Sequence, residues 1–179
     1  MNPQKTYVLD TSAVLSIQQL FSNIDIDPGT TIQLVTTHEI INEFKNDFSK
    51  YRIKAMISSS ELKSMQPSID ALNKISIESK KIGNQSRLSS QDKSVLALAL
   101  EKVNEGESII ILTDDYEIQN TASFLGIKFQ SIRTKGIKYR VKFKKICNDC
   151  KNTNIDPDET ECHNCGSSNI RNRKIKEKI

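Results

Sequence analysis

Several features that define large classes of proteins are missing from this sequence. It has no apolar stretch long enough to cross a bilayer, and no signal peptide opens it. It also has no glycine-rich phosphate loop, and its two histidines leave no Ser/His/Asp set for serine chemistry. These absences argue against a membrane protein, an NTPase and a serine hydrolase. We expect a soluble cytoplasmic protein with no membrane partner.

Cysteine is absent until residue 147, and all four cysteines then occur as two pairs, Cys147-Asn-Asp-Cys150 and Cys162-His-Asn-Cys165, separated by eleven residues. Disulfides would need an oxidising compartment, and nothing in the sequence indicates one. Two thiolates in one tight turn grip an ion, and a second such turn completes a tetrahedron, which predicts a structural zinc ribbon over 145–170. His163 could replace a cysteine as ligand, although four cysteines make it redundant.

Positive charge is scarce in the body of the chain and concentrated after it. Residues 1–127 carry 12 Lys+Arg against 16 Asp+Glu (−4), whereas residues 128–179 carry 14 against 6 (+8). An acidic body with a basic extension is typical of nucleic-acid binding, although a solvated lysine-rich surface would look the same.

The body alternates between apolar runs and helical periodicity. Strands are expected at 6–10, 31–36, 108–113 and 127–132. Helices are expected between them, including one with Ile40, Ile41, Phe44 and Phe48 on its inner face, one at 49–60 with Tyr51 among its apolar positions, and others ending near Lys81, Val103 and Leu125. This pattern predicts an α/β fold, an open parallel sheet flanked by helices. Residues 133–144 would be a basic linker with a short strand, and 171–179 a mobile basic tail.

Acidic residues stand just past a strand or early in the following helix, at Asp10, Glu43, Asp92, Asp114 and Asp115. Each has a purely structural interpretation. Asp10 and Asp115 can cap helices, Asp92 fits a capping box with Ser89, and Glu43 can belong to a solvated face.

Taken together, these acids favour a metal site. Residues beyond the carboxyl ends of parallel strands converge on one crevice, and helices returning across that edge would add Glu43 and Asp92. Glu39, Glu43 and Asp47 would also repel one another on a single helical face, which a nearby cation relieves. Oxygen ligands select Mg²⁺ or Mn²⁺, the ions of phosphodiester hydrolysis. The hydroxyls of Thr11, Ser12 and Thr113 border the expected site.

Four segments carry a resemblance to a known family. "VLDTSAV", the glutamate of "EIINEF", "LSSQDKSVLALAL" and "LTDDYEIQN" resemble the acidic motifs of PIN-domain nucleases, in the same order. "TDDY..QN" followed by a zinc ribbon resembles the Nob branch, endonucleases that trim the 3′ end of small-subunit ribosomal RNA. The resemblance covers about residues 5–170.

The resemblance implies a PIN-like nuclease domain over 1–132 and an endoribonuclease site at Asp10, Glu43, Asp92 and Asp114 or Asp115. Mn²⁺ or Mg²⁺ would be held by the aspartates. Precursor ribosomal RNA within the small-subunit particle would be the partner, and an assembly factor could gate the activity. The cations expected to contact RNA are Lys135, Lys138, Arg140, Lys142, Lys144 and Lys145.

Some features depart from the family pattern, and alternatives stay open. Many PIN domains place the last acid two residues after the threonine, which points to Asp115, but aspartate occupies both positions. No glycine follows Cys150, and the ribbon has no prominent aromatic surface, which favours phosphate contact over base stacking. A toxin-like or general PIN ribonuclease and a non-catalytic RNA-binding scaffold are the alternatives.

Overall fold

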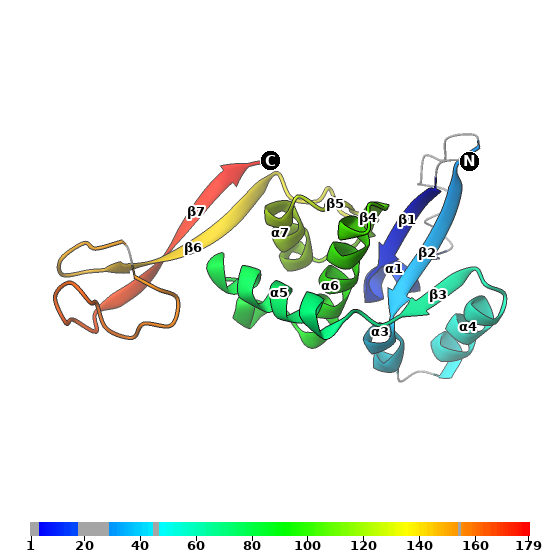
Figure 1. Ribbon diagram of the computed structural model, residues 1–179, viewed down its shortest axis with the longest axis horizontal. Helices are drawn as coiled ribbons and strands as arrows, with labels where there is room; N and C mark the ends of the chain where they lie inside the picture. Colours follow the sequence, from blue (N-terminus) through cyan, green and yellow to red (C-terminus); the bar gives the residue numbers. More distant parts are fainter. Residues whose placement is uncertain (1–3, 18–28, 45–46, 154) are drawn as a thin grey trace.

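Five parallel strands form the central sheet, as the alternation of strands and helices predicts. A computed structural model describes residues 4–17, 29–44, 47–153 and 155–179 (Figure 1). The strands are β1 (Gln4–Leu9), β2 (Thr31–Thr37), β3 (Leu62–Met65), β4 (Ser108–Leu112) and β5 (Lys128–Gln130). They lie in the order β3-β2-β1-β4-β5, and every neighbouring pair is parallel.

This order creates a switch in winding direction beside β1. From β1 the chain proceeds through β2 to β3 at one edge, then returns to β4 on the other side of β1 and continues to β5. In open α/β sheets the crevice at such a switch point, beyond the carboxyl ends of the strands, is where ligands bind. Asp10 directly follows β1, and Asp114 and Asp115 follow β4, so the acids lie at this point of the fold.

The longest helix, α6 (Ser90–Asn104), is the main apolar support of the sheet. Its residues 95–100 are all buried, and it packs against β1, β2, β4 and α5 (Ile69–Lys81). Ser89 caps its start, and the side chain of Asp92 accepts a hydrogen bond from the Ser89 N–H (2.7 Å), so the expected capping box is confirmed. Burial on most sides explains the nearly continuous apolar sequence of this helix.

The other helices in the described residues are shorter than α6. Besides α5, they are α1 (Thr11–Leu15), α3 (His38–Glu43), α4 (Asp47–Ser58), the 3₁₀ turn η1 (Gln85–Arg87) and α7 (Tyr116–Leu125). In the part of the chain that the structure describes, no helix combines the length and the apolar character needed to span a membrane. The periodicity of the sequence predicts that the helix after β1 uses Leu20 and Phe21 as apolar positions, but these two residues lie outside the described residues.

Three expectations for the region after β2 are wrong. The single helix expected over Ile40 to Phe48 ends at Glu43, because Phe44 is extended (ψ 103°), and a second helix starts at Asp47. Asp47 therefore lies on a different helix from Glu39 and Glu43, so the acidic stripe expected on a single helix does not form. Phe48 and Tyr51 are 76% and 72% exposed, not on an inner face. Strand β3 was not expected, because only Leu62 of its four residues is buried.

The C-terminal part of the chain is an antiparallel hairpin. Strand β6 (Tyr139–Cys147) pairs with β7 (Ile170–Lys178) along its whole length, from Tyr139 opposite Lys178 to Cys147 opposite Ile170. Figure 1 shows the hairpin extending from one end of the sheet domain, with the cysteine-bearing loops at its far tip and the C-terminus beside the body. The expected strand at Tyr139, Val141 and Phe143 is confirmed, but the expected mobile tail is wrong, because residues 170–178 form β7.

The hairpin is attached to the body through the free edge of β6. The Asn120 amide on α7 donates to the Val141 carbonyl (2.9 Å) and accepts from the Val141 N–H (2.6 Å). The Phe143 N–H donates to the Ile82 carbonyl (2.9 Å). Because this edge is satisfied by the body, the hairpin is held in one orientation by hydrogen bonds with fixed geometry.

Two cation–π contacts reinforce this attachment. The guanidinium of Arg87 lies 4.5 Å from the ring centroid of Phe143, and that of Arg140 lies 4.7 Å from the ring of Phe124. Gly83 lets β6 approach, since a Cβ there would stand 2.8 Å from the Cβ of Phe143.

Candidate active site and cysteine cluster

Asp10 is the most buried of the acids, with 5% of its surface exposed. It caps α1, as expected, by accepting a hydrogen bond from the Ala13 N–H (2.7 Å), and it also accepts from the Ser12 hydroxyl (2.8 Å) and the Thr113 hydroxyl. Burial raises the pKa of Asp10, although these hydrogen bonds lower it in part, and the charge of Asp115 adds to the rise. A buried carboxylate repelled by a neighbouring one is stabilised by a cation.

Glu43 approaches Asp10 from the neighbouring strand connection. It is the last residue of α3, which Thr37 caps directly after β2. The Thr11 hydroxyl donates to Glu43 Oε2 at 2.6 Å, which ties Glu43 to the residue beside Asp10. The two acids therefore lie at the same edge of the sheet.

Asp92 enters from the start of α6. Ser94, two residues after Asp92, has its hydroxyl 2.7 Å from the hydroxyl of Thr37 at the end of β2. The start of α6 therefore lies beside the carboxyl end of that strand. One oxygen of Asp92 is engaged in the capping box, and the other carries no such bond in the described residues. The capping interpretation is confirmed and leaves one oxygen for a ligand.

Asp114 and Asp115 have different surroundings although they are adjacent. Asp115 caps α7, as expected, through Oδ1 and the N–H groups of Glu117 (2.6 Å) and Ile118 (3.2 Å). Its own N–H donates to the hydroxyl of Thr113 (3.0 Å), the same hydroxyl that donates to Asp10. Asp115 is therefore one hydrogen-bonding group away from Asp10.

The carboxylate of Asp114 is directed instead to the segment after β5. It accepts hydrogen bonds from the N–H groups of Ile132 (2.9 Å), Arg133 (3.1 Å) and Thr134 (3.2 Å). Burial would raise the pKa of Asp114, but these N–H groups outweigh it and lower the pKa to about 2. Asp114 is thus fully occupied as a backbone acceptor.

The electrostatics of this edge fit a hard cation. None of Asp10, Glu43, Asp92 and Asp115 forms an ion pair with a Lys or Arg among the described residues. Their oxygens are not as tightly grouped as the thiols, which form the one set of metal-type ligands within 4.8 Å in the described chain. Mg²⁺-like ions are commonly bound through one or two carboxylates and several waters, so this looser arrangement suits such an ion.

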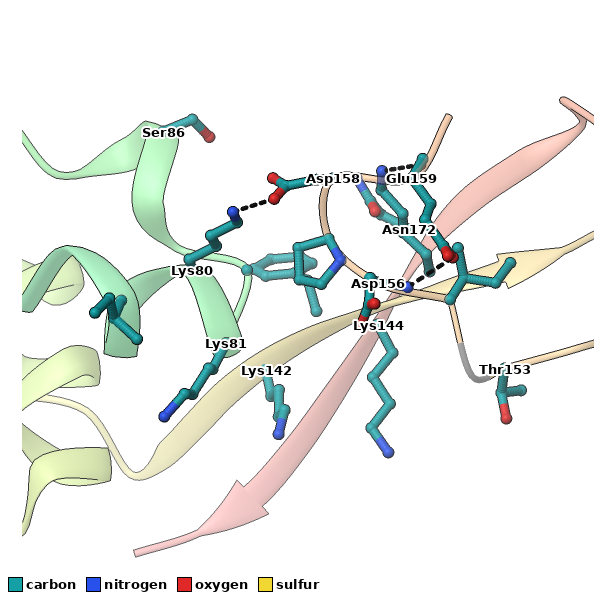
Figure 2. A pocket seen from close by; sticks show the side chains of 16 residues that line it. Lys80, Lys81, Ser86, Lys142, Lys144, Thr153, Asp156, Asp158, Glu159 and Asn172 are labelled. Carbon is teal, nitrogen blue, oxygen red and sulfur yellow. Dashed lines mark hydrogen bonds and ion pairs between the residues drawn. The ribbon is translucent and has the colours of Figure 1, made fainter. Parts of the chain in front are cut away.

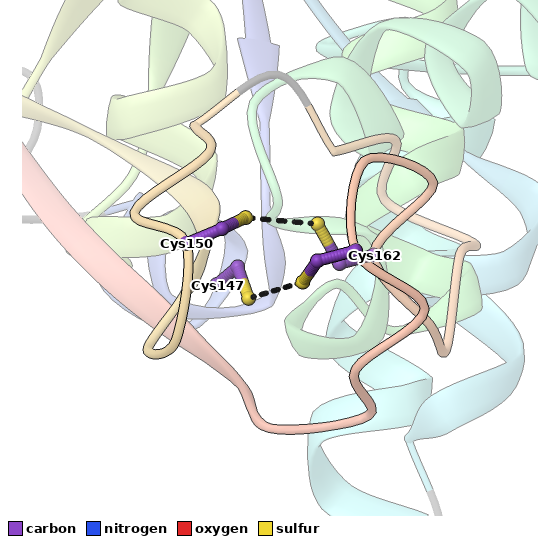
Figure 3. Close-up of side chains that lie close together, drawn as sticks. Cys147, Cys150 and Cys162 are labelled. Carbon is purple, nitrogen blue, oxygen red and sulfur yellow. Dashed lines mark hydrogen bonds between the residues drawn. The ribbon is translucent and has the colours of Figure 1, made fainter.

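The four cysteines converge at the tip of the hairpin (Figure 3). Their sulfurs all lie within 4.8 Å of one another, with Cys147 Sγ 3.6 Å from Cys165 Sγ and Cys150 Sγ 3.5 Å from Cys162 Sγ. A tetrahedron with metal–sulfur bonds of about 2.3 Å has sulfur–sulfur edges of about 3.8 Å. The cluster therefore has the size and donor set of a four-thiolate metal site.

The two cysteine turns have the same backbone shape. Gly166, after Cys165, has φ +71°, and Lys151, after Cys150, has φ +62°. In each turn the N–H of this residue donates to the carbonyl of the first cysteine, at 2.7 Å for Gly166 and 3.1 Å for Lys151. The missing glycine therefore does not change the first turn, but it places a lysine in the left-handed region that favours glycine.

A basic groove of about 860 Å³ separates the end of α5 from β6 and the first cysteine loop. In Figure 2 the side chains of Lys81, Lys142 and Lys144 extend away from Asp158, which pairs with Lys80. Lys81 is the last residue of α5 and lies outside the segment expected to bind RNA. Only the fold places it beside Lys142 and Lys144, so local sequence could not single it out.

The six cations expected to contact RNA differ in availability. Lys135, Lys138 and Lys144 are exposed, and Lys142 is half-buried. Arg140 pairs with Glu177 (2.8 Å), and Lys145 donates to the Glu159 carbonyl (2.6 Å). Strand β7 adds exposed cations that were assigned to a mobile tail, namely Arg171, Arg173, Lys174, Lys176 and Lys178.

Comparison with known proteins agrees with this architecture. Residues 7–101, more than half of the chain, match the family model of the PIN domain of ribonuclease. The chain is 34% identical over 140 residues to Endoribonuclease Nob1 of Pyrococcus abyssi, covering 78% of this chain and 83% of that protein. It is 32% identical over 176 residues to Endoribonuclease Nob1 of Methanocaldococcus jannaschii, covering 98% and 81%.

A relative with a different name also matches over most of the chain. Ribonuclease VapC1 of Thermoplasma acidophilum is 32% identical over 160 residues, covering 89% of this chain and 74% of that protein. The family model, the relatives, the parallel sheet with acids at its switch point and the cysteine cluster lead to one assignment. The chain belongs to the Nob1 family of PIN-domain endoribonucleases.

Proposed function

We propose that the protein is a divalent-metal-dependent endoribonuclease that cleaves precursor small-subunit ribosomal RNA at its 3′ end in the cytoplasm. The observation that carries this proposal is the buried carboxylate of Asp10 at the switch point, with Glu43 and Asp115 close by and no ion pair from a Lys or Arg of the described residues to neutralise them. The relatives named Endoribonuclease Nob1 support the choice of substrate class.

Asp10, Glu43, Asp92 and Asp115 would hold Mn²⁺ or Mg²⁺, directly or through water. Such an ion, when bound, lowers the pKa of the attacking water and stabilises the leaving oxygen. The hydroxyl of Thr113 donates to the carboxylate of Asp10 and accepts a hydrogen bond from the backbone N–H of Asp115. It would therefore fix the position of Asp115 relative to Asp10. We do not assign Asp114 as a ligand, because its oxygens are occupied by the backbone of residues 132–134.

In this proposal the two parts of the chain have different roles. Residues 1–132 would cleave the RNA, and the module at 145–170 would bind Zn²⁺ through its four thiolates and hold the RNA. The cations of the linker, above all Lys135, Lys138, Lys142 and Lys144, would contact phosphates of the precursor within the small-subunit particle. An assembly factor that gates the activity is part of this proposal.

The test uses the purified full-length chain with an RNA that spans the 3′ end of small-subunit ribosomal RNA and its downstream spacer. We expect cleavage at one position near the mature end with Mn²⁺, and no cleavage when neither Mn²⁺ nor Mg²⁺ is added. The Asp10→Asn variant, purified in parallel, shows whether any cutting comes from a contaminating nuclease.

A second candidate is a general ribonuclease, which the similarity to Ribonuclease VapC1 favours. That activity would give scattered cuts in the ribosomal RNA and equal cutting of an unrelated RNA of the same length. An RNA that is bound but intact with Mn²⁺ and with Mg²⁺ would instead mean a non-catalytic scaffold.

A further inference from the structure

Residues 131–137, which we call the basic loop, lie between β5 and β6 and carry two exposed cations, Arg133 and Lys135. A loop on the surface of a protein usually has few fixed contacts. This one is held at several points by side chains from the start of α7 and the residues before it.

Asp114 anchors the first half of the basic loop. Besides three backbone N–H groups, its carboxylate accepts a hydrogen bond from the Thr134 hydroxyl (3.2 Å) and from Nε of Arg133 (3.2 Å). The Thr134 hydroxyl in turn receives the Gly136 N–H (3.3 Å). One carboxylate therefore fixes both the backbone of the loop and the direction of the Arg133 side chain.

Gln119, which is fully buried, anchors the second half. Its amide donates to the Thr113 carbonyl (2.9 Å) and the Ser131 hydroxyl (3.1 Å), and it accepts from the Ile137 N–H (2.9 Å). Gly136 has φ +66°, and a Cβ there would stand 2.6 Å from the Ser131 hydroxyl. The loop is thus held in one conformation from Ser131 to Ile137.

The residues that anchor the loop lie beside the acidic edge, by which we mean the carboxyl end of the sheet with Asp10, Glu43, Asp92 and Asp115. Thr113 donates to Asp10, and Asp115 follows Asp114 directly. The basic loop is therefore attached at the carboxyl end of β4 through Asp114, which lies between Thr113 and Asp115 in the sequence.

Arg133 remains available to a ligand although it is oriented. Its side chain is 61% exposed, and only Nε meets Asp114, so the two terminal nitrogens have no acceptor within the described chain. An exposed ion pair contributes little to stability, but a guanidinium held through Nε presents its remaining N–H groups in a fixed fork that matches a phosphate.

We propose that Arg133 contacts a phosphate of the RNA close to the cleaved bond, and that Asp114 is a positioning residue that acts through Arg133 and the basic loop. This inference rests on the proposed function, because it takes RNA as the ligand of the acidic edge. It assigns different roles to two adjacent aspartates, one at the metal site and one behind the substrate-binding loop.

The first experiment compares Arg133→Ala with Lys63→Ala, an exposed cation on β3 at the far edge of the sheet. The probe is a single-stranded RNA of the small-subunit 3′ end, and its affinity is measured with zinc-loaded protein and no added Mn²⁺ or Mg²⁺, at several salt concentrations. Arg133→Ala should weaken binding about 5- to 20-fold and lower the slope of log affinity against log salt by about 0.7 to 1, whereas Lys63→Ala should change neither. With Mn²⁺, Arg133→Ala should raise KM and leave kcat nearly unchanged.

The second experiment separates positioning from metal binding. Asp114→Ala should weaken RNA binding as Arg133→Ala does, and the double variant should be no weaker than either single one, because both changes remove the same contact. The Mn²⁺ concentration for half-maximal cleavage should stay unchanged in Asp114→Ala and rise in Asp115→Ala. Asp114→Asn, which keeps an acceptor oxygen, should restore part of the affinity.

Affinity and salt slope equal to wild type in Arg133→Ala would overturn the phosphate contact. A raised Mn²⁺ requirement in Asp114→Ala or Asp114→Asn would overturn the positioning role. Because the binding measurements need no cleavage, a wild-type protein that bound but did not cut RNA would disprove the proposed nuclease and still decide the role of Arg133.

Discussion

The body and the hairpin are stabilised in different ways. The body buries a continuous apolar core between its sheet and helices, whereas the core at the hairpin tip consists of Cys147, Ile155 and Cys162 with Cys150 and Ile170 packed beside them. A module of this size has too little apolar surface to fold on hydrophobic burial alone. The thiols are therefore the core of one region, while the carboxylates lie at the edge of a core that the other region builds from apolar side chains.

This contrast gives the two candidate metal sites different physical meanings. Loss of an ion from the acidic edge would remove chemistry from a domain that stays folded, since the acids sit on a scaffold with its own core. Loss of an ion from the cysteines would remove the centre of the small core, because metal binding and folding are coupled in such modules. The difference in net charge follows the same division, with catalysis assigned to the acidic body and RNA binding to the basic hairpin.

The largest expected effect comes from Asp10→Asn. Cleavage should fall about 10²- to 10⁴-fold, because the ligand that holds the ion is lost, while RNA affinity and melting temperature stay near wild type. Asparagine remains a good N-cap, so α1 should keep its start. Rates and affinities are measured against Asp70→Asn, an exposed acid in the first turn of α5. Parallel loss of affinity and cleavage would contradict the division between the two regions.

Cys162→Ser should affect the other region alone. We expect loss of bound zinc by elemental analysis, unfolding of the hairpin tip and at least about tenfold weaker RNA binding, because three thiolates cannot close the site. The unfolding transition of the body should persist. Glu161→Gln, an exposed neighbour, is the matched control. An unchanged zinc content would refute the four-cysteine site.

Gly83→Ala tests whether the two regions are docked as one unit. Its Cβ would stand 2.8 Å from the Phe143 Cβ, so we expect a loss of about 1–3 kcal/mol in unfolding free energy and faster hydrogen exchange at the Phe143 N–H. Gly106→Ala is the control, because Gly106 also has a positive φ (+86°) but nothing within 4 Å of its Cβ. Equal losses in both variants would mean that only backbone strain is being measured.

Lys151→Gly should have the smallest effect, and it should be stabilising. The left-handed conformation of Lys151 costs about 1–2 kcal/mol, and glycine returns part of this after its own entropic cost, leaving a gain of up to about 1 kcal/mol. The melting temperature of the zinc-loaded hairpin tip is the measurement. Lys151→Ala removes the charge but not the Cβ, and an equal gain there would assign the effect to charge.

Local sequence was sufficient for most elements of the body. The caps at Ser89 and Asp115, the strands at β1, β2 and β4 and the long helix α6 follow from periodicity and capping chemistry that act within a few residues. The break at Phe44 and the strand β3 did not follow, because tertiary packing overrode a continuous helical pattern and only one residue of β3 is buried.

Strand β7 of the hairpin also could not be predicted from local sequence. The polar sequence of 171–179 has no apolar periodicity of its own, and it becomes β7 because β6 supplies a partner for its backbone. A strand defined by pairing, and not by burial, leaves little signal in its side chains.

By itself, the sequence determined the alternation that produces a parallel sheet, the acids that follow its strands and the two cysteine pairs whose spacing suits a tetrahedral ion. Only the tertiary structure distinguishes Asp114 from Asp115, since identical side chains at adjacent positions differ in nothing but their surroundings. Asp114 meets the N–H groups of residues 132–134, whereas Asp115 shares a threonine hydroxyl with Asp10. Those partners are distant along the chain, and folding alone brings them into hydrogen-bonding range.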